Sequence, residues 1–96
     1  MEFIVKIKVD LPGDMPDEQR AALQKAEAER AAELAAEGHL VRLWRIIGRR
    51  ENWGLWRAKD GTELHAALSS LPMFPYRDIE VVPLARHPVD PAPPSS

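Results

Sequence analysis

The order in which strand-like and helix-like patterns follow one another constrains the fold of this chain more than any other feature of its sequence. Apolar residues at every second position predict a strand over residues 3–11, and an alanine- and glutamate-rich stretch predicts a long helix over residues 16–37. Branched and aromatic residues then predict two further strands, over residues 39–48 and 52–57, joined by a turn at residues 49–51. The first half of the chain is therefore expected to run strand, helix, strand, strand.

The second half of the chain should contain one more helix and one more strand. Asp60 followed by Glu63 is typical of a capping box and predicts the start of the helix. The apolar stripe of that helix consists of Leu64, Leu68 and Leu71. The prolines within residues 71–76 prevent the helix from continuing, and strand character returns over residues 79–82. The complete order, βαββαβ, predicts a ferredoxin-like α+β fold in which both helices cover one face of an antiparallel sheet.

Local signals predict the ends of the first helix and the limits of the domain. We expect Asp14 to cap that helix and Gly38 to end it. Residues 1–88 should form a single domain. Residues 89–96 are rich in proline and have no periodic pattern, so we expect an extended tail, or one that is ordered only against another subunit.

Composition excludes several classes of function. The 96 residues include no cysteine, which rules out a disulfide framework, a thiolate nucleophile and a sulfur-ligated metal. Thirteen basic and fifteen acidic side chains are spread along the chain and leave a net charge of −2, so nucleic acid is a poor candidate for a partner. The first residues resemble neither a secretory signal nor a membrane span, and we therefore expect a cytoplasmic protein.

The predicted second strand is apolar on both of its sides, which indicates association between copies of the chain. Alternation along the strand places one apolar set on one side, namely Leu40, Trp44 and Ile46. It places a second set on the opposite side, namely Val41, Leu43 and Ile47. Strand-end irregularity in a monomer is one explanation. We favour sheet-on-sheet or edge association with another copy, because a small domain gains stability from oligomerisation.

One carboxylate lies where the first helix should pack on the sheet. At about 100° per residue, Glu27 falls on the same narrow stripe as Leu23 and Leu34. A carboxylate on that face would lose hydration, become a stronger base and be able to take a proton from a carbon acid. The alternative is a structural role, in which Glu27 pairs with Arg30 at the edge of the stripe.

Other residue types give weaker indications of function. The three histidines lack the spacing of metal ligands, and the glycines form no phosphate-binding cluster. His65 flanks the apolar stripe of the second helix, where a hydrogen-bonded boundary residue is commoner than a catalyst. Five aromatic residues could line an apolar pocket or simply fill the core, namely Trp44, Trp53, Trp56, Phe74 and Tyr76.

Several residue strings of this chain resemble one family. The strings are Leu43-Trp44-Arg45-Ile46, Leu64-His65, Leu71-Pro72-Met73-Phe74-Pro75-Tyr76-Arg77-Asp78-Ile79-Glu80-Val81 and Arg86-His87-Pro88. They are similar to those of muconolactone Δ-isomerase, and the resemblance covers nearly all of the chain except the tail. It implies a ferredoxin-like subunit in a closed decamer, with active sites near subunit boundaries and with neither a metal nor an organic cofactor.

The family's reaction converts muconolactone to 3-oxoadipate enol-lactone in the catechol branch of the 3-oxoadipate pathway. A proton moves from the ring carbon that bears the carboxymethyl arm to the carbon beside the lactone carbonyl. The reaction needs a base, stabilisation of a dienolate and a group that holds the free carboxylate. The resemblance and the residue types imply Glu27 as the base and Arg45 as the carboxylate clamp. Candidate donors to the lactone oxygens are Asn52, His65 and Tyr76.

Three alternative functions share parts of this pattern. Arg49-Arg50-Glu51 and Trp53 depart from what the family leads us to expect around the second turn, which leaves the substrate range open. A chloromuconolactone dehalogenase would have a similar fold. A cofactor-free monooxygenase of the dimeric α+β barrel group would share the strand order but would require oxygen. A non-enzymatic ligand-binding module would tolerate loss of the Glu27 carboxylate.

Overall fold

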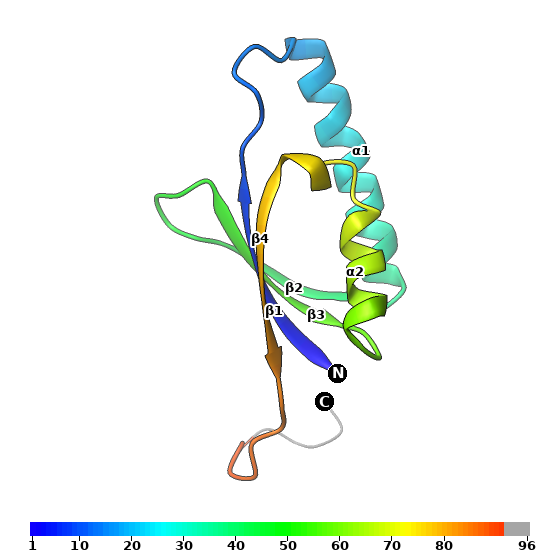
Figure 1. The fold of residues 1–96 in the computed structure, drawn as a ribbon, viewed down its shortest axis with the longest axis vertical. Coiled ribbons are helices and arrows are strands. Elements are labelled where there is room, and N and C mark those ends of the chain that lie inside the picture. Colours follow the sequence, from blue (N-terminus) through cyan, green and yellow to red (C-terminus); the bar gives the residue numbers. More distant parts are fainter. Residues whose placement is uncertain (92–96) are drawn as a thin grey trace.

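The computed structural model describes residues 1–91 and has the predicted order of elements. The elements, with a short 3-10 turn η1 before the last strand, are β1 (Glu2–Val9), α1 (Asp17–Ala36), β2 (Leu40–Arg45), β3 (Glu51–Arg57), α2 (Gly61–Ser69), η1 (Phe74–Tyr76) and β4 (Arg77–Leu84). The strands form one sheet in the order β2-β3-β1-β4, and each neighbouring pair is antiparallel. Both helices lie on the same side of this sheet (Figure 1). The ferredoxin-like α+β prediction is confirmed.

The core lies between the two helices and one face of the central strand. Alternate residues of β1 point toward the helices because side chains alternate along a strand, and Phe3, Val5 and Ile7 are buried there. They pack with Leu34 of α1 and with Leu64 and Leu68 of α2. Leu71 also lies in this core, but it follows the end of α2 and is not part of the helix as predicted. Leu34 lies near the end of α1, whereas the preceding turns of that helix are only partly covered. The first half of α1 is therefore available to line a cavity.

The two helices begin differently from each other, and one predicted cap is wrong. Before α1 the N-cap position is taken by Pro16, which provides no side-chain hydrogen bond, because Asp14 lies two residues too early. The capping box of α2 is confirmed, since the Glu63 backbone N–H donates to Asp60 Oδ1 at 2.9 Å. The predicted stop at Gly38 is also confirmed, because this residue has a φ of +87°, which glycine adopts without strain.

The second strand is shorter and less regular than predicted. It ends at Arg45, and Gly48 turns the chain with a φ of +77°, while Glu51 belongs to β3 and not to the turn. A register shift between Leu40 and Arg42 interrupts the alternation of side chains. Leu40 therefore faces the helices with its partner Trp56, whereas Trp44 faces away with its partner Trp53. The prediction that Leu40 and Trp44 share one side is wrong.

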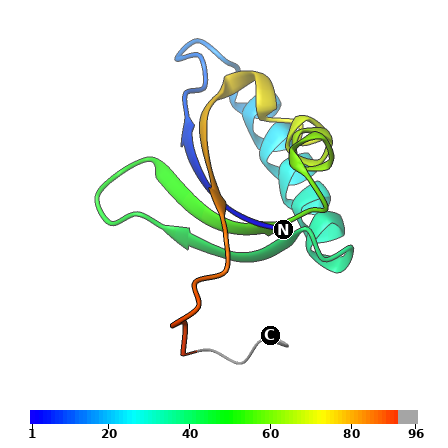
Figure 2. The ribbon, with the colours of Figure 1, turned by 60° about the horizontal axis from the view of Figure 1, so that its bottom comes forward.

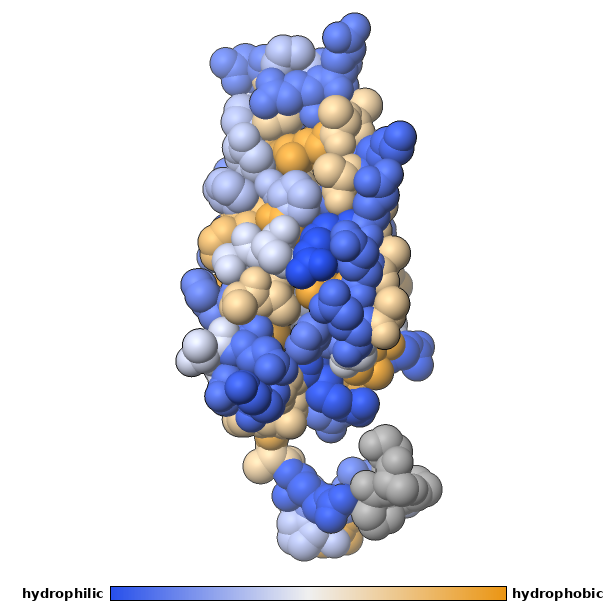
Figure 3. Space-filling model, turned by 90° about the vertical axis from the view of Figure 1, so that its right-hand side faces the viewer, coloured by the Kyte–Doolittle hydropathy of each residue, from blue (hydrophilic) through white to orange (hydrophobic). Residues whose placement is uncertain are grey.

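The face of the sheet that points away from the helices carries exposed apolar side chains. Trp44 is 43% exposed and Trp53 is 37% exposed, and Lys6 lies over the ring of Trp53 at 4.4 Å. The helix side, by contrast, is largely hydrophilic with smaller apolar patches (Figure 3). The single subunit thus leaves an apolar area of the outer sheet face uncovered, as the predicted association between copies requires.

The described residues bear on one further expectation, a membrane span, and leave another, the tail, untested. No helix formed by residues 1–91 combines the length and the apolar character that a membrane crossing requires. Most of the predicted proline-rich tail, residues 92–96, lies outside the described residues.

Candidate functional site

A cavity of about 580 Å³ lies between α1 and the helix-facing side of the sheet. The β2–β3 hairpin, which contributes several of its lining residues, extends away from α1 (Figure 2). Residues of α1, β2 and β3 line it, together with Met73, Arg77 and the end of β1. This volume is in the range of pockets that hold small organic ligands.

The strand register brings two of the predicted site residues side by side. Arg45 of β2 pairs with Asn52 of β3, and Asn52 in turn pairs with Ile7 of β1. Because Ile7 is buried beneath the helices, its cross-strand partners face the same way, toward α1. Glu27 reaches the same cavity from α1. The structure thus brings together Glu27, Arg45 and Asn52, which lie far apart in the sequence.

The carboxylate of Glu27 is held at both oxygens. Its Oε1 accepts a hydrogen bond from the Met73 backbone N–H at 3.0 Å, and its Oε2 lies 2.5 Å from Nη2 of Arg77. The two side chains are largely enclosed, with 13% of Glu27 and 7% of Arg77 exposed. Arg30 is not the partner of Glu27, because it pairs with Glu33 and Glu37 and donates a hydrogen bond to Ser70. A held carboxylate that also lines a cavity has the geometry of a positioned base.

Arg77 is the residue of this site that the sequence reasoning missed. It is the first residue of β4 and pairs with Val9 at the end of β1. A signal was present, since Arg77 has the same parity along β4 as Ile79, which packs against the core. A charged residue at an inward position of a strand requires a partner, and fifty positions of sequence separate Arg77 from that partner, Glu27.

The mouth of the cavity carries an excess of positive charge. Arg20, Arg45 and Arg50 line it, and none of these three side chains forms an ion pair with any of residues 1–91. Glu51 is already engaged, since it pairs with Arg49 at 3.8 Å. Asp10 is an exposed carboxylate at the same edge. Unpaired guanidinium groups at a cavity entrance favour an anionic ligand, above all a carboxylate.

Asn52 contributes a polar group to the wall of the cavity. Its Oδ1 is enclosed and has no hydrogen-bond partner within the described part of the chain. An unpaired buried oxygen costs stability and is unusual in a residue with a purely structural role. Asn52 is therefore a candidate to hydrogen-bond a bound ligand.

The other two predicted site residues do not line this cavity in one subunit. His65 is exposed on α2 and forms a T-shaped ring contact with Phe74, with ring centroids 6.0 Å apart. Tyr76 ends η1, and its backbone carbonyl accepts the Asp10 N–H at 2.8 Å. Their assignment as donors to the lactone remains a prediction that the geometry of a single subunit does not support.

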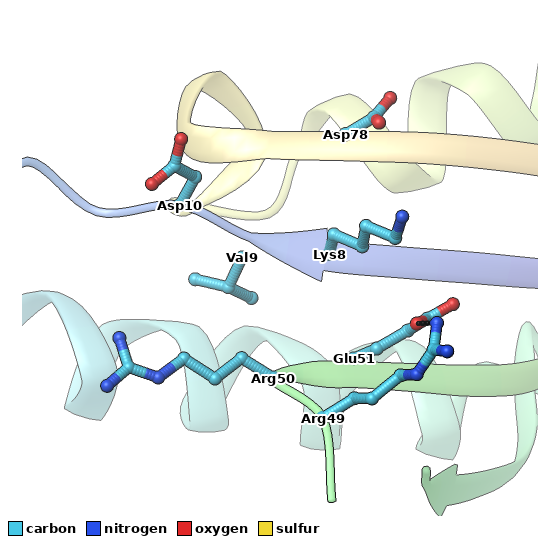
Figure 4. A pocket seen from close by; sticks show the side chains of 7 residues that line it. All are labelled: Lys8, Val9, Asp10, Arg49, Arg50, Glu51 and Asp78. Carbon is cyan, nitrogen blue, oxygen red and sulfur yellow. Dashed lines mark ion pairs between the residues drawn. The ribbon is translucent and has the colours of Figure 1, made fainter.

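A smaller hollow of about 390 Å³ lies on the outer side of the sheet at the same end (Figure 4). Lys8 of β1 lies between Glu51 and Asp78 of its neighbouring strands, and Arg49 pairs with Glu51. The Arg50 side chain extends away from that of Arg49 (Figure 4). Because the charges of this hollow largely neutralise one another, it is a weaker candidate than the cavity beneath α1. Residues 1–91 contain no cluster of three potential metal ligands.

Comparison with known proteins gives one consistent result. A family model described as muconolactone delta-isomerase matches residues 1–90. The muconolactone Δ-isomerase of Pseudomonas aeruginosa is 44% identical to this chain over 88 residues, which cover 92% of this chain and 92% of that protein. The muconolactone Δ-isomerase of Cupriavidus pinatubonensis is 40% identical over 88 residues, which cover 92% of this chain and 96% of that protein. A crystal structure of muconolactone isomerase matches with a TM-score of 0.90 at 41% identity, over 97% of both chains.

Proposed function

The chain belongs to the muconolactone Δ-isomerase family and is an enzyme of that kind, and from this premise we propose that it isomerises its lactone in the cavity beneath α1. In the proposed reaction, the ring carbon that bears the carboxymethyl arm loses a proton, and the electron pair delocalises to a dienolate. The carbon beside the lactone carbonyl then gains a proton. The product is 3-oxoadipate enol-lactone, and the reaction belongs to catechol degradation.

Glu27 is the proposed base. Each of its oxygens has one partner, Met73 N–H or Arg77, and a carboxylate oxygen retains a further lone pair with which to accept a proton. One carboxylate can remove the proton and return it two carbons away if the same face of the ring stays over it. The site then needs no second acid.

The arginines at the mouth are the proposed anchor for the free carboxylate of the substrate. Arg45 lies beside Asn52, and Arg50 lines the same wall, so a guanidinium and an amide are available together. A bidentate arginine fixes both the position and the direction of a carboxylate. With the arm anchored there, Asn52 is the proposed hydrogen-bond partner of the lactone ring.

The proposal rests on one observation: a carboxylate and several arginines line the same cavity. A held, largely enclosed carboxylate, Glu27, faces the space that unpaired arginines border. An anionic carbon acid requires this combination, because its carboxylate must be bound while its C–H bond meets a base. A mere binding module would gain nothing from the carboxylate.

We further propose that the subunits assemble into a homo-oligomer, the decamer that the family resemblance implies, which works in the cytoplasm. The exposed pair of Trp44 and Trp53 on the outer sheet face supports association, because exposed aromatic patches are typical of interfaces.

Turnover of the substrate tests the proposed reaction. Purified protein is incubated with muconolactone, and formation of the enol-lactone is followed by NMR, with a parallel sample from which oxygen has been removed. We expect conversion at equal rates in both samples. Absence of conversion over a range of pH would contradict the proposal, and a requirement for oxygen would favour the monooxygenase alternative.

A further inference from the structure

We propose that Arg77 is a positioning residue for the reaction: it holds the Glu27 carboxylate in one orientation. This inference rests on the proposed function, in which Glu27 is the base. It concerns a residue that touches the base and not the substrate, so its expected signature is a fall in kcat with a smaller change in KM.

Arg77 is itself held by regular backbone structure. It starts β4 directly after η1, and its backbone pairs with Val9 of β1. The preceding turn is closed by hydrogen bonds from Phe74 N–H to the Leu71 carbonyl and from Tyr76 N–H to the Met73 carbonyl. A group supported by a central strand and a closed turn is suited to positioning another.

The two contacts of Glu27 come from one short segment. Met73 holds Oε1 and Arg77 holds Oε2, and the two residues flank η1. With both oxygens held, rotation of the carboxylate about its last side-chain bond is restricted, although that bond otherwise rotates broadly. Loss of the Arg77 contact would release this rotation and the alignment of the base with the substrate's C–H bond.

Several charged side chains line the cavity that Glu27 faces. Arg20 of α1, Arg45 of β2 and Arg50 of the hairpin line the cavity, and so do the acids Asp10 and Glu51. Arg77, however, is the cation that touches Glu27, and it is far more enclosed than the exposed Arg45 and Arg50. Charges interact more strongly where water is excluded, so Arg77 should attract the Glu27 carboxylate more strongly than the other arginines of the cavity do.

This ion pair is a poor device for stability alone. Among residues 1–91, the buried Nε of Arg77 has no hydrogen-bond partner. A buried arginine that is incompletely hydrogen-bonded is commonly replaceable by apolar residues without loss of stability when its partner is replaced too. A role in orienting the Glu27 carboxylate accounts for the arrangement better.

The test compares neutral and charged replacements of Arg77. Arg77→Met and Arg77→Gln remove the charge, Arg77→Lys retains it, and Arg57→Met is the matched control because Arg57 forms an exposed pair with Glu2 at 3.1 Å. For muconolactone, we expect the neutral variants to lower kcat by about 10²-fold, the effect of a misplaced reacting group. Arg77→Lys should lower kcat less than the neutral variants, because its ammonium can still contact the Glu27 carboxylate, and Arg57→Met should match the parent.

The outcomes separate this inference from the proposed function. Circular dichroism first establishes that each variant is folded, and if Arg77→Met is not folded, Arg77→Gln serves as the neutral variant. Neutral variants whose kcat matches that of the parent would overturn the role of Arg77 while leaving Glu27 as the base. Full activity of the double variant Glu27→Gln/Arg77→Met would overturn the proposed base itself, and the role of Arg77 with it.

Discussion

Replacing Glu27 with glutamine is nearly isosteric, yet the structure predicts a large loss of stability. The glutamine oxygen can still accept the Met73 N–H, but the amide removes the charge that faces Arg77, whose side chain is only 7% exposed. Removing one partner of a buried ion pair costs about 3–5 kcal/mol, and the open cavity places this site toward the lower value. A loss of about 3 kcal/mol corresponds to a fall in Tm of roughly 12–24 °C for a domain of this size.

A second substitution should restore part of this loss. Arg77→Met removes the charge that Glu27→Gln leaves unpaired, and methionine fills much of the same space with an apolar chain. The double variant should therefore be more stable than the sum of the two single changes implies. We expect an interaction energy toward the upper end of roughly 0.5–3 kcal/mol, because both groups are largely enclosed.

Thermal unfolding followed by circular dichroism measures these differences, at one subunit concentration because assembly changes Tm. Glu2→Gln and Arg57→Met provide the matched control, since this pair has the same chemistry but is about half exposed, and it should contribute about 0–1 kcal/mol. The reasoning is refuted if the effects of Glu27→Gln and Arg77→Met add to within about 0.5 kcal/mol. It is also refuted if Glu27→Gln changes Tm no more than Glu2→Gln.

Four further predictions concern other parts of the chain. Gly54→Ala should lower the free energy of unfolding by about 1–3 kcal/mol, because the new Cβ would lie 2.7 Å from Nε1 of the buried Trp56. Denaturant titrations measure this effect, and an unchanged unfolding midpoint would contradict it. Arg45→Ala should raise KM for muconolactone by about 10- to 100-fold with a smaller effect on kcat, since it removes a charged hydrogen bond. Steady-state kinetics that show an unchanged KM would exclude Arg45 as the group that binds the substrate carboxylate. Light scattering should show a homo-oligomer larger than a dimer, and a monomer would contradict this. Truncation after His87 should leave the circular dichroism spectrum of the fold intact, and an unfolded truncated chain would contradict that expectation.

The order of elements could be predicted from the sequence because periodicity depends on local spacing. The strand pattern of β1 and the capping box at Asp60 both act within a few residues, and the structure has both. The irregularity in β2 could not be predicted in the same way. A register shift at Leu40 depends on how β2 and β3 pair, and it reverses the side on which Trp44 lies relative to simple alternation. Pro16 likewise displaced the expected cap at Asp14.

The candidate site was predictable where it depended on one element. Glu27 could be found because helical spacing alone places it on the inner stripe of α1. Arg77 could not be assigned, because its contact with Glu27 requires the register of β4 on β1 and the closure of the turn at η1. His65 was predicted from its match to the family and lies outside the cavity of one subunit. Residue type and matching position identify candidates, whereas their grouping depends on tertiary register.

The most direct test of Glu27 as the base compares two variants that differ at that carboxylate alone. In Arg77→Met and Glu27→Gln/Arg77→Met the buried arginine charge is absent from both proteins, so neither contains the unpaired arginine that Glu27→Gln alone would leave. We predict that kcat for muconolactone in the double variant falls below that of Arg77→Met by about 10-fold or more, because a positioned proton-transfer group contributes about 10²- to 10⁴-fold and Arg77→Met has already lost the part that depends on alignment. Values of kcat for the two folded variants within a few-fold of each other would show that the proton is carried by a group other than Glu27.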